Sequence, residues 1–263
     1  MKTITYDNLT NLITNKKVAI VGPADYVNKE LNDKHGEYID SFDIIIRLNS
    51  MIKFPEENNI YLTKYYGSKF NILASSFWYE NDHKKIINEK YNRSRYIYSN
   101  QYNNINHDLI LFENTNRNLF KHIYDINKPF FDNHNNFSYC NVPNQKHYNA
   151  IQYLNQIYHN NYYSTTGILT IANILLMKPK ELYVTGITLY KDTKYNGYYD
   201  NYNLFSKDEL ILQYNNPSYI FDGKNYKPNA IFGHNVICEQ KQMEYLIKNN
   251  IINVDKYLKS LYI

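Results

Sequence analysis

The sequence predicts an α/β protein with a Rossmann-like, mostly parallel sheet and helices on both faces. Three observations support this fold class: short β-branched runs recur along the chain, amphipathic stretches lie between them, and several runs stop at Gly or Asn. Near-continuous apolar strands that alternate with helices are typical of a parallel sheet covered on both faces. The composition is ordinary for a globular protein, with 43% hydrophobic and 21% charged residues. We therefore expect a single domain over residues 1–263.

The expected strands are short apolar runs that end in turn-forming residues. In chain order they are Lys17–Gly22, Phe42–Asn49, Phe70–Ala74, Tyr96–Tyr98, Leu109–Phe112 and Leu182–Gly186. The amphipathic stretches expected as helices are Asp82–Tyr91, Glu113–Tyr124, Gln145–His159, Thr165–Met177 and Ile237–Lys248. The segment 191–229 is rich in Tyr, Asn and Gly and only weakly periodic. Loops of this length in a compact domain are usually lids or disordered, and its place between two candidate site segments favours a lid.

Composition and charge exclude several classes of protein. No apolar run reaches the roughly 18 to 20 residues of a membrane span, and Met1–Asn15 lacks an apolar signal region. We therefore expect a cytoplasmic protein without a transmembrane segment. The net charge of +4 suits an anionic small ligand or surface and does not indicate a nucleic-acid partner. With Cys140 and Cys238 alone, the chain has at most one disulfide and no four-cysteine zinc site.

A parallel sheet binds ligands at the carboxyl ends of its strands, near a switch in strand order. Four segments are expected there: the turn after Gly22, the strand end at Asn49, the helix start at Ser164–Gly167, and the loop after Gly186. A strand that ends in Gly lets a nucleotide approach closely, although a tight turn in any α/β protein looks the same. The G-x-G-x-x-G and G-x-x-x-x-G-K-[ST] patterns are absent, so neither a dinucleotide site nor a phosphate loop is indicated.

Polar residues interrupt the second expected strand near its end. A buried Arg is costly unless it is paired, so Arg47 is expected in a structural ion pair with Asp40 or Asp43. Asn49, at the strand exit, is the better candidate for a ligand contact.

The helix start Ser164-Thr165-Thr166-Gly167 joins hydroxyl side chains to a Gly and an apolar helix. Backbone N–H groups at such a helix N-terminus favour an anion. Simple N-capping by Ser164 or Thr165 is the alternative, and the two roles are compatible.

His234 follows a Gly and precedes an amphipathic helix, so it is placed like an exposed general base. Glu239 lies five positions later and is not on the same helix face, so a direct dyad is not assured. No D-x-D, H-E-x-x-H, C-x-x-C or G-x-S-x-G pattern occurs, and we predict neither metal dependence nor serine-hydrolase chemistry. The other histidines in polar segments, which are expected at the surface, include His83, His107 and His134.

Taken in order, these pieces resemble the sialyltransferases of glycosyltransferase family 29, which use CMP-sialic acid. The long sialylmotif of that family is similar to three pieces here, namely Val18–Gly22, Ile39–Asn49 and Gly67-Ser68-Lys69. Its shorter motifs are similar to Ser164–Gly167 with Val184–Gly186, to His234 with Glu239, and to Tyr198-Tyr199-Asp200. The layout also resembles the bacterial sialyltransferases of family 42. The resemblance covers residues 17 to 250 and implies a GT-A-like variant of the Rossmann-like fold.

The chain departs from these families at three places. Both families carry an Asn where this chain has Pro23, and the bacterial family has an Arg where this chain has Tyr163. The two motif cysteines of family 29, near Val18 and Lys178 here, are absent together, which is consistent with a reducing compartment. The departure at Tyr163 bears on the identity of the sugar more than on that of the nucleotide.

The resemblance implies an inverting, metal-independent transfer of sialic acid from CMP-sialic acid to a hydroxyl of a glycan or glycolipid acceptor, with no further cofactor. It implies that His234 is the base and that Tyr190, with Tyr195 or Tyr199, contacts the phosphate. The remaining donor contacts that it implies are Gly22, Pro23, Asn49, Ser76, Ser164, Thr165, Thr166, Gly167 and Gly186. Two alternatives stay open: a transferase for another CMP-activated sugar such as Kdo, and an inactive nucleotide-binding protein. Peripheral membrane contact and the oligomeric state also stay open.

Overall fold

The computed structural model describes residues 2–48, 60–75, 108–113, 132, 136–160, 164–189, 191–192, 219–221, 224–226, 230–231 and 234–263. In these residues an eight-stranded, all-parallel sheet has the order β1-β6-β5-β4-β3-β2-β7-β12. The strands are β1 (Lys2–Thr3), β2 (Lys17–Val21), β3 (Ile44–Leu48), β4 (Ile72–Ser75), β5 (Leu109–Glu113), β6 (Phe137–Asn141), β7 (Glu181–Thr185) and β12 (Asn253–Val254). The predicted fold class is confirmed.

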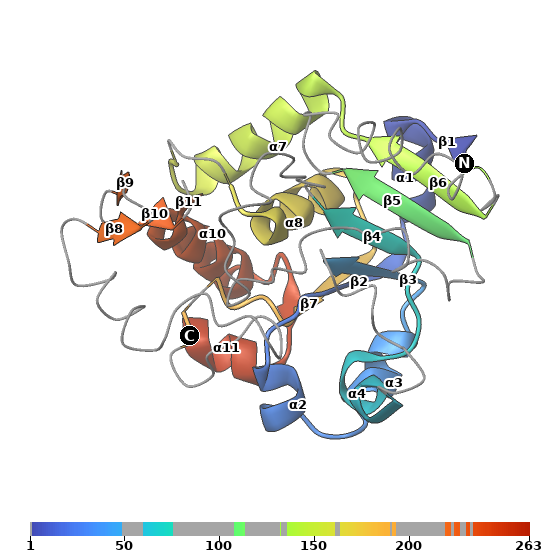
Figure 1. The fold of residues 1–263 in the computed structure, drawn as a ribbon, viewed down its shortest axis with the longest axis horizontal. Coiled ribbons are helices and arrows are strands. Elements are labelled where there is room, and N and C mark those ends of the chain that lie inside the picture. The colour runs from blue at the N-terminus through green and yellow to red at the C-terminus, as the bar shows by residue number, and fades with distance from the viewer. Residues whose placement is uncertain are drawn as a thin grey trace.

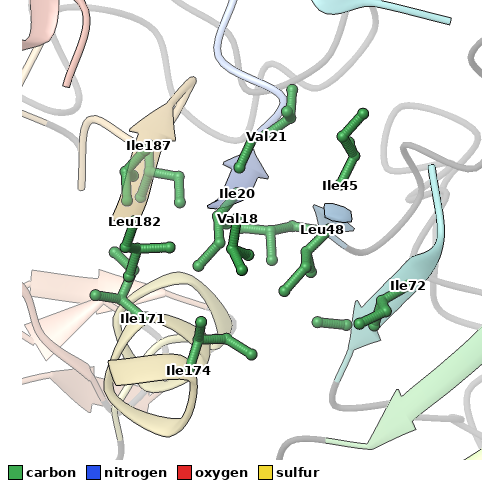
Figure 2. Close-up of a cluster of buried hydrophobic side chains, with 14 of the residues drawn as sticks. Val18, Ile20, Val21, Ile45, Leu48, Ile72, Ile171, Ile174, Leu182 and Ile187 are labelled. Carbon is green, nitrogen blue, oxygen red and sulfur yellow. The ribbon is translucent and has the colours of Figure 1, made fainter. Parts of the chain in front are cut away.

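Helices cover both faces of the sheet (Figure 1). One layer contains α1 (Tyr6–Ile13), α7 (Asn144–Ile157), α8 (Thr166–Leu176) and α10 (Val236–Lys248). The other contains α2 (Tyr26–Glu30), α3 (His35–Asp40), α4 (Ile60–Tyr66) and α11 (Lys256–Tyr262). Successive residues of β7 face opposite layers: Leu182 packs toward α8 (Figure 2), and Tyr183 contacts α3.

The strand order reverses between β2 and β7. From β2 the chain builds outward through β3, β4, β5 and β6, and β7 then returns to the other side of β2. Val21 of β2 pairs in register with Thr185 of β7, so the two carboxyl ends lie side by side. This is the switch point where sheets of this class bind ligands.

The core consists of β-branched strand residues packed against α8. Val18 and Ile20 of β2 are fully buried, and Ile171 and Ile174 of α8 lie against this face of the sheet (Figure 2). α8 is buried along most of its length, from Gly167 to Ile174. A helix that is apolar all round belongs in an interior, and this explains why its start lies at the centre of the sheet rather than at an edge.

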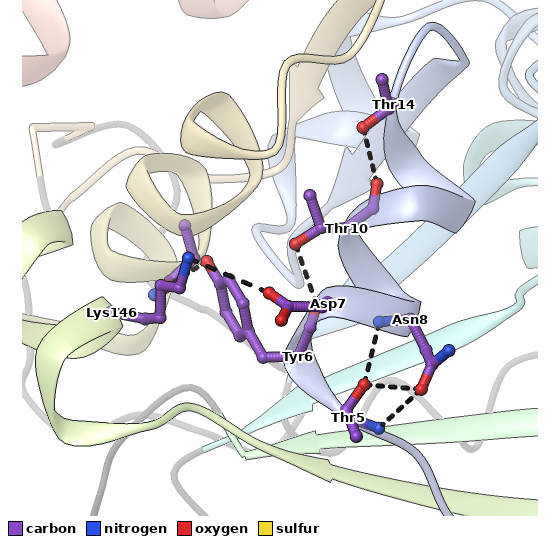
Figure 3. A network of polar contacts seen from close by, with 8 residues as sticks. Thr5, Tyr6, Asp7, Asn8, Thr10, Thr14 and Lys146 are labelled. Atoms are coloured by element: carbon purple, nitrogen blue, oxygen red, sulfur yellow. Dashed lines mark hydrogen bonds and ion pairs between the residues drawn. The ribbon is translucent and has the colours of Figure 1, made fainter.

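The first helix was not predicted, because Met1–Asn15 is polar in composition. α1 begins at a capping box in which the Thr5 hydroxyl accepts from the Asn8 N–H (3.1 Å) and the Asn8 side chain accepts from the Thr5 N–H (3.3 Å; Figure 3). Its Tyr6 hydroxyl donates to Asn173 of α8 (3.3 Å). The buried stripe of α1 consists of Tyr6, Leu9 and Ile13. This stripe and the hydrogen bond from Tyr6 anchor α1 beside α8.

Other elements differ from the prediction. β6 was not predicted, because the run Phe137–Asn141 is short and only partly apolar and directly follows the polar stretch Asp132–Asn136. Glu113 was expected to start a helix but is the last residue of β5, and 114–124 lie outside the described residues. The expected strand at 96–98 and helix at 82–91 also lie outside them. Of the predicted lid, the structure describes residues 191–192 and the antiparallel pair β8 (Tyr219–Phe221) and β9 (Lys224–Tyr226).

Candidate functional site

Two glycines cross at the switch point between β2 and β7. The Gly22 N–H donates to the Thr185 carbonyl (2.8 Å), and the Ala24 N–H donates to the Gly186 carbonyl (3.1 Å). A Cβ added at Gly22 would lie 2.2 Å from the Gly186 oxygen, and one at Gly186 would lie 2.1 Å from the Gly22 oxygen. Gly186 also has a φ of +71°. Close approach of two backbones therefore requires both glycines, apart from any role toward a ligand.

The start of α8 joins this crossing through one side chain. A Cβ at Gly167 would lie 3.1 Å from Cγ2 of Ile187 and 3.8 Å from Cδ1 of Leu48. Ile187 also lies against Gly22, where an added Cβ would be 2.6 Å from its Cγ1. The structure thus brings together the turn after Gly22, the helix start at Gly167 and the loop after Gly186. Leu48, beside Gly167, is the last described residue before Asn49, the fourth predicted segment.

Thr165, at the start of α8, is held by a buried carboxyl group from α10. The Thr165 N–H donates to Oε1 of Glu239 (2.8 Å), and the Thr165 hydroxyl lies 2.6 Å from Oε2. Thr165 is the N-cap residue of α8, yet its side chain makes no capping bond to the helix. The expected alternative of N-capping by the Thr165 side chain is therefore wrong, because its hydroxyl is engaged by Glu239. Ser164 and Thr166 are half-buried beside it.

Glu239 is fully buried, and this environment favours its neutral form. Burial raises the pKa of the Glu239 carboxyl to about 8, and the two bonds from Thr165 act in the opposite direction. Sequence reasoning did not find this role. The signal was present, since Glu239 lies three residues after Val236 and four before Met243, on the buried face of α10.

A second buried network lies under the crossing and was also missed. The Tyr26 hydroxyl donates to Asp255 (2.6 Å) and accepts from the Gly186 N–H (2.7 Å). The Thr185 hydroxyl donates to the same carboxylate oxygen (2.8 Å), and the other oxygen accepts from the Leu258 N–H at the start of α11. Sequence alone could not reveal this network, because Tyr26 lies 160 positions from Gly186 and 229 from Asp255, and Thr185 lies 70 positions from Asp255.

Two of the pieces that resemble the long sialylmotif, at 39–48 and 67–69, form a structural unit beside α3 and α4. Arg47 is fully buried, and one guanidinium nitrogen, Nη2, donates to the carbonyls of Tyr66, Gly67 and Lys69 (3.1, 2.8 and 3.0 Å). It therefore binds the carboxyl end of α4, where a cation is favoured. The predicted ion pair is wrong: Asp40 and Asp43 instead accept from backbone N–H groups.

Asp40 joins α3 to the loop after α4. Its carboxylate accepts from the Ser68 N–H (2.8 Å), the Ser68 hydroxyl (2.8 Å) and the Lys69 N–H (2.9 Å). The Asp43 carboxylate accepts from the Lys17 N–H (2.9 Å). Two separated pieces of the motif are thus bonded to each other, which gives their residue types a structural reason.

Several predicted site residues lie outside the described residues, namely Asn49, Ser76, Tyr190, Tyr195 and Tyr199. The backbone of His234 is in β11 (His234–Asn235), which pairs with β10 (Ala230–Ile231) and leads directly into α10. Pro23 is buried between Gly22 and Ala24. The residues that the structure describes therefore form the floor of the predicted site and the start of α8.

In the described residues, no cluster of three or more His, Cys, Asp or Glu side chains is placed to hold a metal ion. Within the same residues, no helix is both long and apolar enough to cross a membrane. A scan of the chain against known protein families finds no match, and a search of curated proteins finds no significant match.

Proposed function

We propose that the chain is an inverting glycosyltransferase that moves sialic acid from CMP-sialic acid to a hydroxyl of a glycan acceptor without a metal ion. One observation carries the proposal: the segments around Gly22, Gly167 and Gly186 converge on Ile187 at the switch between β2 and β7. Sheets of this class bind nucleotides at this position. The fold thus supports a nucleotide ligand, and the choice of CMP and sialic acid rests on the motif resemblance.

In this proposal the start of α8 faces the donor phosphate. Backbone N–H groups at a helix start, together with the helix dipole, favour an anion. The Thr165 side chain does not cap α8, and Glu239 withdraws it to one side. Donors that face the phosphate act most strongly when it gains charge, so they stabilise the transition state more than the bound donor. Tyr190, with Tyr195 or Tyr199, supplies further donors.

The proposed reaction needs one base. His234 accepts the proton of the acceptor hydroxyl while the oxygen forms its bond to the anomeric carbon of the sugar. The bond from that carbon to the phosphate oxygen breaks at the same time, and CMP departs with the electron pair. A histidine has an ordinary pKa of about 6.5, which suits this role near neutral pH.

The proposal also includes a cytoplasmic location. Cys140 and Cys238 are both buried and are not joined in a disulfide. Free thiols of this kind persist in reducing compartments.

A donor screen tests the proposed function. The purified chain is incubated with CMP-sialic acid, CMP-Kdo and UDP-sugars, with and without EDTA, and released nucleotide is measured by mass spectrometry. We expect release of CMP from CMP-sialic acid, unchanged by EDTA. Release from CMP-Kdo alone would favour the transferase for another CMP-sugar, to which the departures at Pro23 and Tyr163 point.

Thermal unfolding with nucleotides separates the broader classes. We expect CMP to raise the melting temperature, and UMP, UDP and NAD to leave it unchanged, because a ligand stabilises only the state that binds it. Stabilisation by CMP without turnover of any CMP-sugar would favour an inactive nucleotide-binding protein. Stabilisation by NAD or UDP instead would contradict the proposed function.

A further inference from the structure

The contact between Glu239 and Thr165 joins a side chain without solvent access to one that is partly exposed. The Glu239 side chain is fully buried, whereas Thr165 is half-buried at the start of α8. Both carboxyl oxygens bind the same residue, Oε1 to its N–H and Oε2 to its hydroxyl. Any change in the carboxyl group is therefore transmitted to one hydroxyl at the predicted donor site.

The protonation state of the carboxyl decides where that hydroxyl hydrogen points. An ionised carboxylate only accepts hydrogen bonds, so the Thr165 hydroxyl must direct its hydrogen to Oε2. A protonated carboxyl can donate from Oε2 to the Thr165 oxygen, which leaves the hydroxyl hydrogen to turn toward another acceptor. The Thr165 N–H donates to Oε1 in both states, so the backbone stays in place.

Building on the proposed function, we infer that Glu239 is a positioning residue that controls donor binding through Thr165. In its protonated form Glu239 directs the Thr165 hydroxyl hydrogen toward the donor phosphate. In its ionised form it withdraws that hydrogen and adds a negative charge behind the phosphate. Binding of the nucleotide and protonation of Glu239 therefore favour each other.

The surroundings of Glu239 support this inference. Burial raises the pKa of its carboxyl to about 8, so the neutral form predominates at pH 7. α8 contributes no charged side chain between Thr166 and Leu176. On α10 itself, burial and the nearby Glu239 raise the pKa of the Cys238 thiol. α7 packs on a later part of α10, where Tyr153 faces Tyr245. No basic group among these described neighbours offsets the charge of an ionised Glu239.

The test is the affinity for CMP, measured by calorimetry between pH 7 and pH 9.5. This window lies above the phosphate pKa of about 6 and the ordinary histidine pKa of about 6.5, so most of the titration of both groups is complete before the window begins. We expect the dissociation constant of the wild-type chain to rise above pH 8, by at most about tenfold per pH unit for one linked proton. In E239Q, which mimics the protonated carboxyl, this rise disappears. In Thr165→Val, affinity is already reduced at pH 7, and the rise is smaller than in the wild-type chain, because only the charge of Glu239 still acts on the phosphate.

Glu244→Gln is the matched control, because Glu244 is on the same helix and pairs at the surface with Lys241 and Lys248. It should keep the wild-type pH profile. An unchanged profile in E239Q would overturn the inference while leaving the proposed function intact. If the wild-type chain binds no CMP at any pH, the proposed function fails, and the inference with it.

Infrared spectroscopy gives a readout that does not need a nucleotide. The wild-type minus E239Q difference spectrum should contain a protonated-carboxyl band at pH 7 that disappears by pH 9.5. Absence of this band at pH 7 would overturn the inference directly. If E239Q does not fold, the pH titration of the wild-type carboxyl band and the affinity of Thr165→Val decide the question.

Discussion

The Tyr26 hydroxyl donates a 2.6 Å hydrogen bond to the Asp255 carboxylate and joins the helix after β2 to the last helix of the chain. The same hydroxyl accepts from the Gly186 N–H, so it also fixes the peptide that crosses Gly22. Tyr26 is fully buried and stacks on Tyr257 with ring centroids 4.7 Å apart. The floor of the candidate site thus depends on the C-terminal helix α11, which makes no part of the predicted motifs.

Tyr26→Phe tests this dependence. The change leaves the Gly186 N–H without its buried acceptor and removes one of the donors to the Asp255 carboxylate, which keeps the Thr185 hydroxyl and the Leu258 N–H. An unsatisfied buried group costs about 1–3 kcal/mol. We expect the free energy of unfolding to fall by about that amount in urea denaturation. Tyr257→Phe is the control, because the Tyr257 hydroxyl makes a longer, half-buried bond to Asp192 (3.2 Å), and its loss should cost less. Equal costs for the two variants would contradict the assigned role of Tyr26.

Alanine substitutions at Gly186 and Gly167 should lower the free energy of unfolding by different amounts, because the two glycines have different space around them. Gly186→Ala places a Cβ 2.1 Å from a backbone oxygen and at a φ of +71°, so neither neighbour nor backbone can relax cheaply. We expect a loss of about 3 kcal/mol or more, or failure to fold. At Gly167→Ala the added Cβ makes one tight contact, with the flexible Ile187 side chain at 3.1 Å, and an ordinary one with Leu48 at 3.8 Å, so the change should cost about 1 kcal/mol or less. Melting temperatures in the opposite order would show that the close approach is not required.

The buried neutral ring of His35 should make the folded chain less stable in mild acid. Its Nδ1 lies 2.6 Å from the Tyr65 carbonyl and its Nε2 2.8 Å from the Tyr183 hydroxyl, so the neutral ring donates from Nδ1 and accepts at Nε2. Burial lowers the pKa of His35 below its ordinary value of 6.5. The folded chain then binds fewer protons than the unfolded chain just below pH 6.5. The contribution of His35 to the free energy of unfolding is therefore present above pH 6.5 and is lost as the pH falls toward the pKa of His35 in the folded chain.

Denaturation between pH 5 and pH 7.5 measures this effect. We expect His35→Asn, which keeps a donor near Nδ1, to lower the stability at neutral pH and to flatten its decline below pH 6.5. His159→Gln, at an exposed position, should leave the wild-type profile unchanged. A decline that survives in His35→Asn would assign the acid sensitivity to another group.

His234→Ala tests the proposed base. We expect the affinity for CMP to stay within about twofold and the rate of transfer to fall by at least ~100-fold, because general base catalysis contributes about that much. Calorimetry measures the first and product formation the second. Retained transfer across neutral pH would remove His234 from this role.

The sequence by itself determined the fold class, the strands β2, β3, β4, β5 and β7, the helices α7, α8 and α10, and the glycines at the switch point. Apolar runs such as Lys17–Val21 and the apolar helix α8 are buried wherever they occur, so their pattern reveals them. The strands β1, β12 and β6 were beyond this reasoning, because β1 and β12 contain two residues each and β6 is a short, partly polar run without a clear hydrophobic period.

Only the tertiary structure decided what the polar residues do. Arg47 was expected to meet a carboxylate and instead binds the end of α4, because α4 and Asp40 meet through the loop at Ser68. For Glu239 the sequence left a dyad with His234 unassured and named no other partner; the structure pairs it with Thr165, 74 positions earlier. A helix pattern reports which face is buried, but the polar atom that a buried carboxyl meets depends on how separate elements pack.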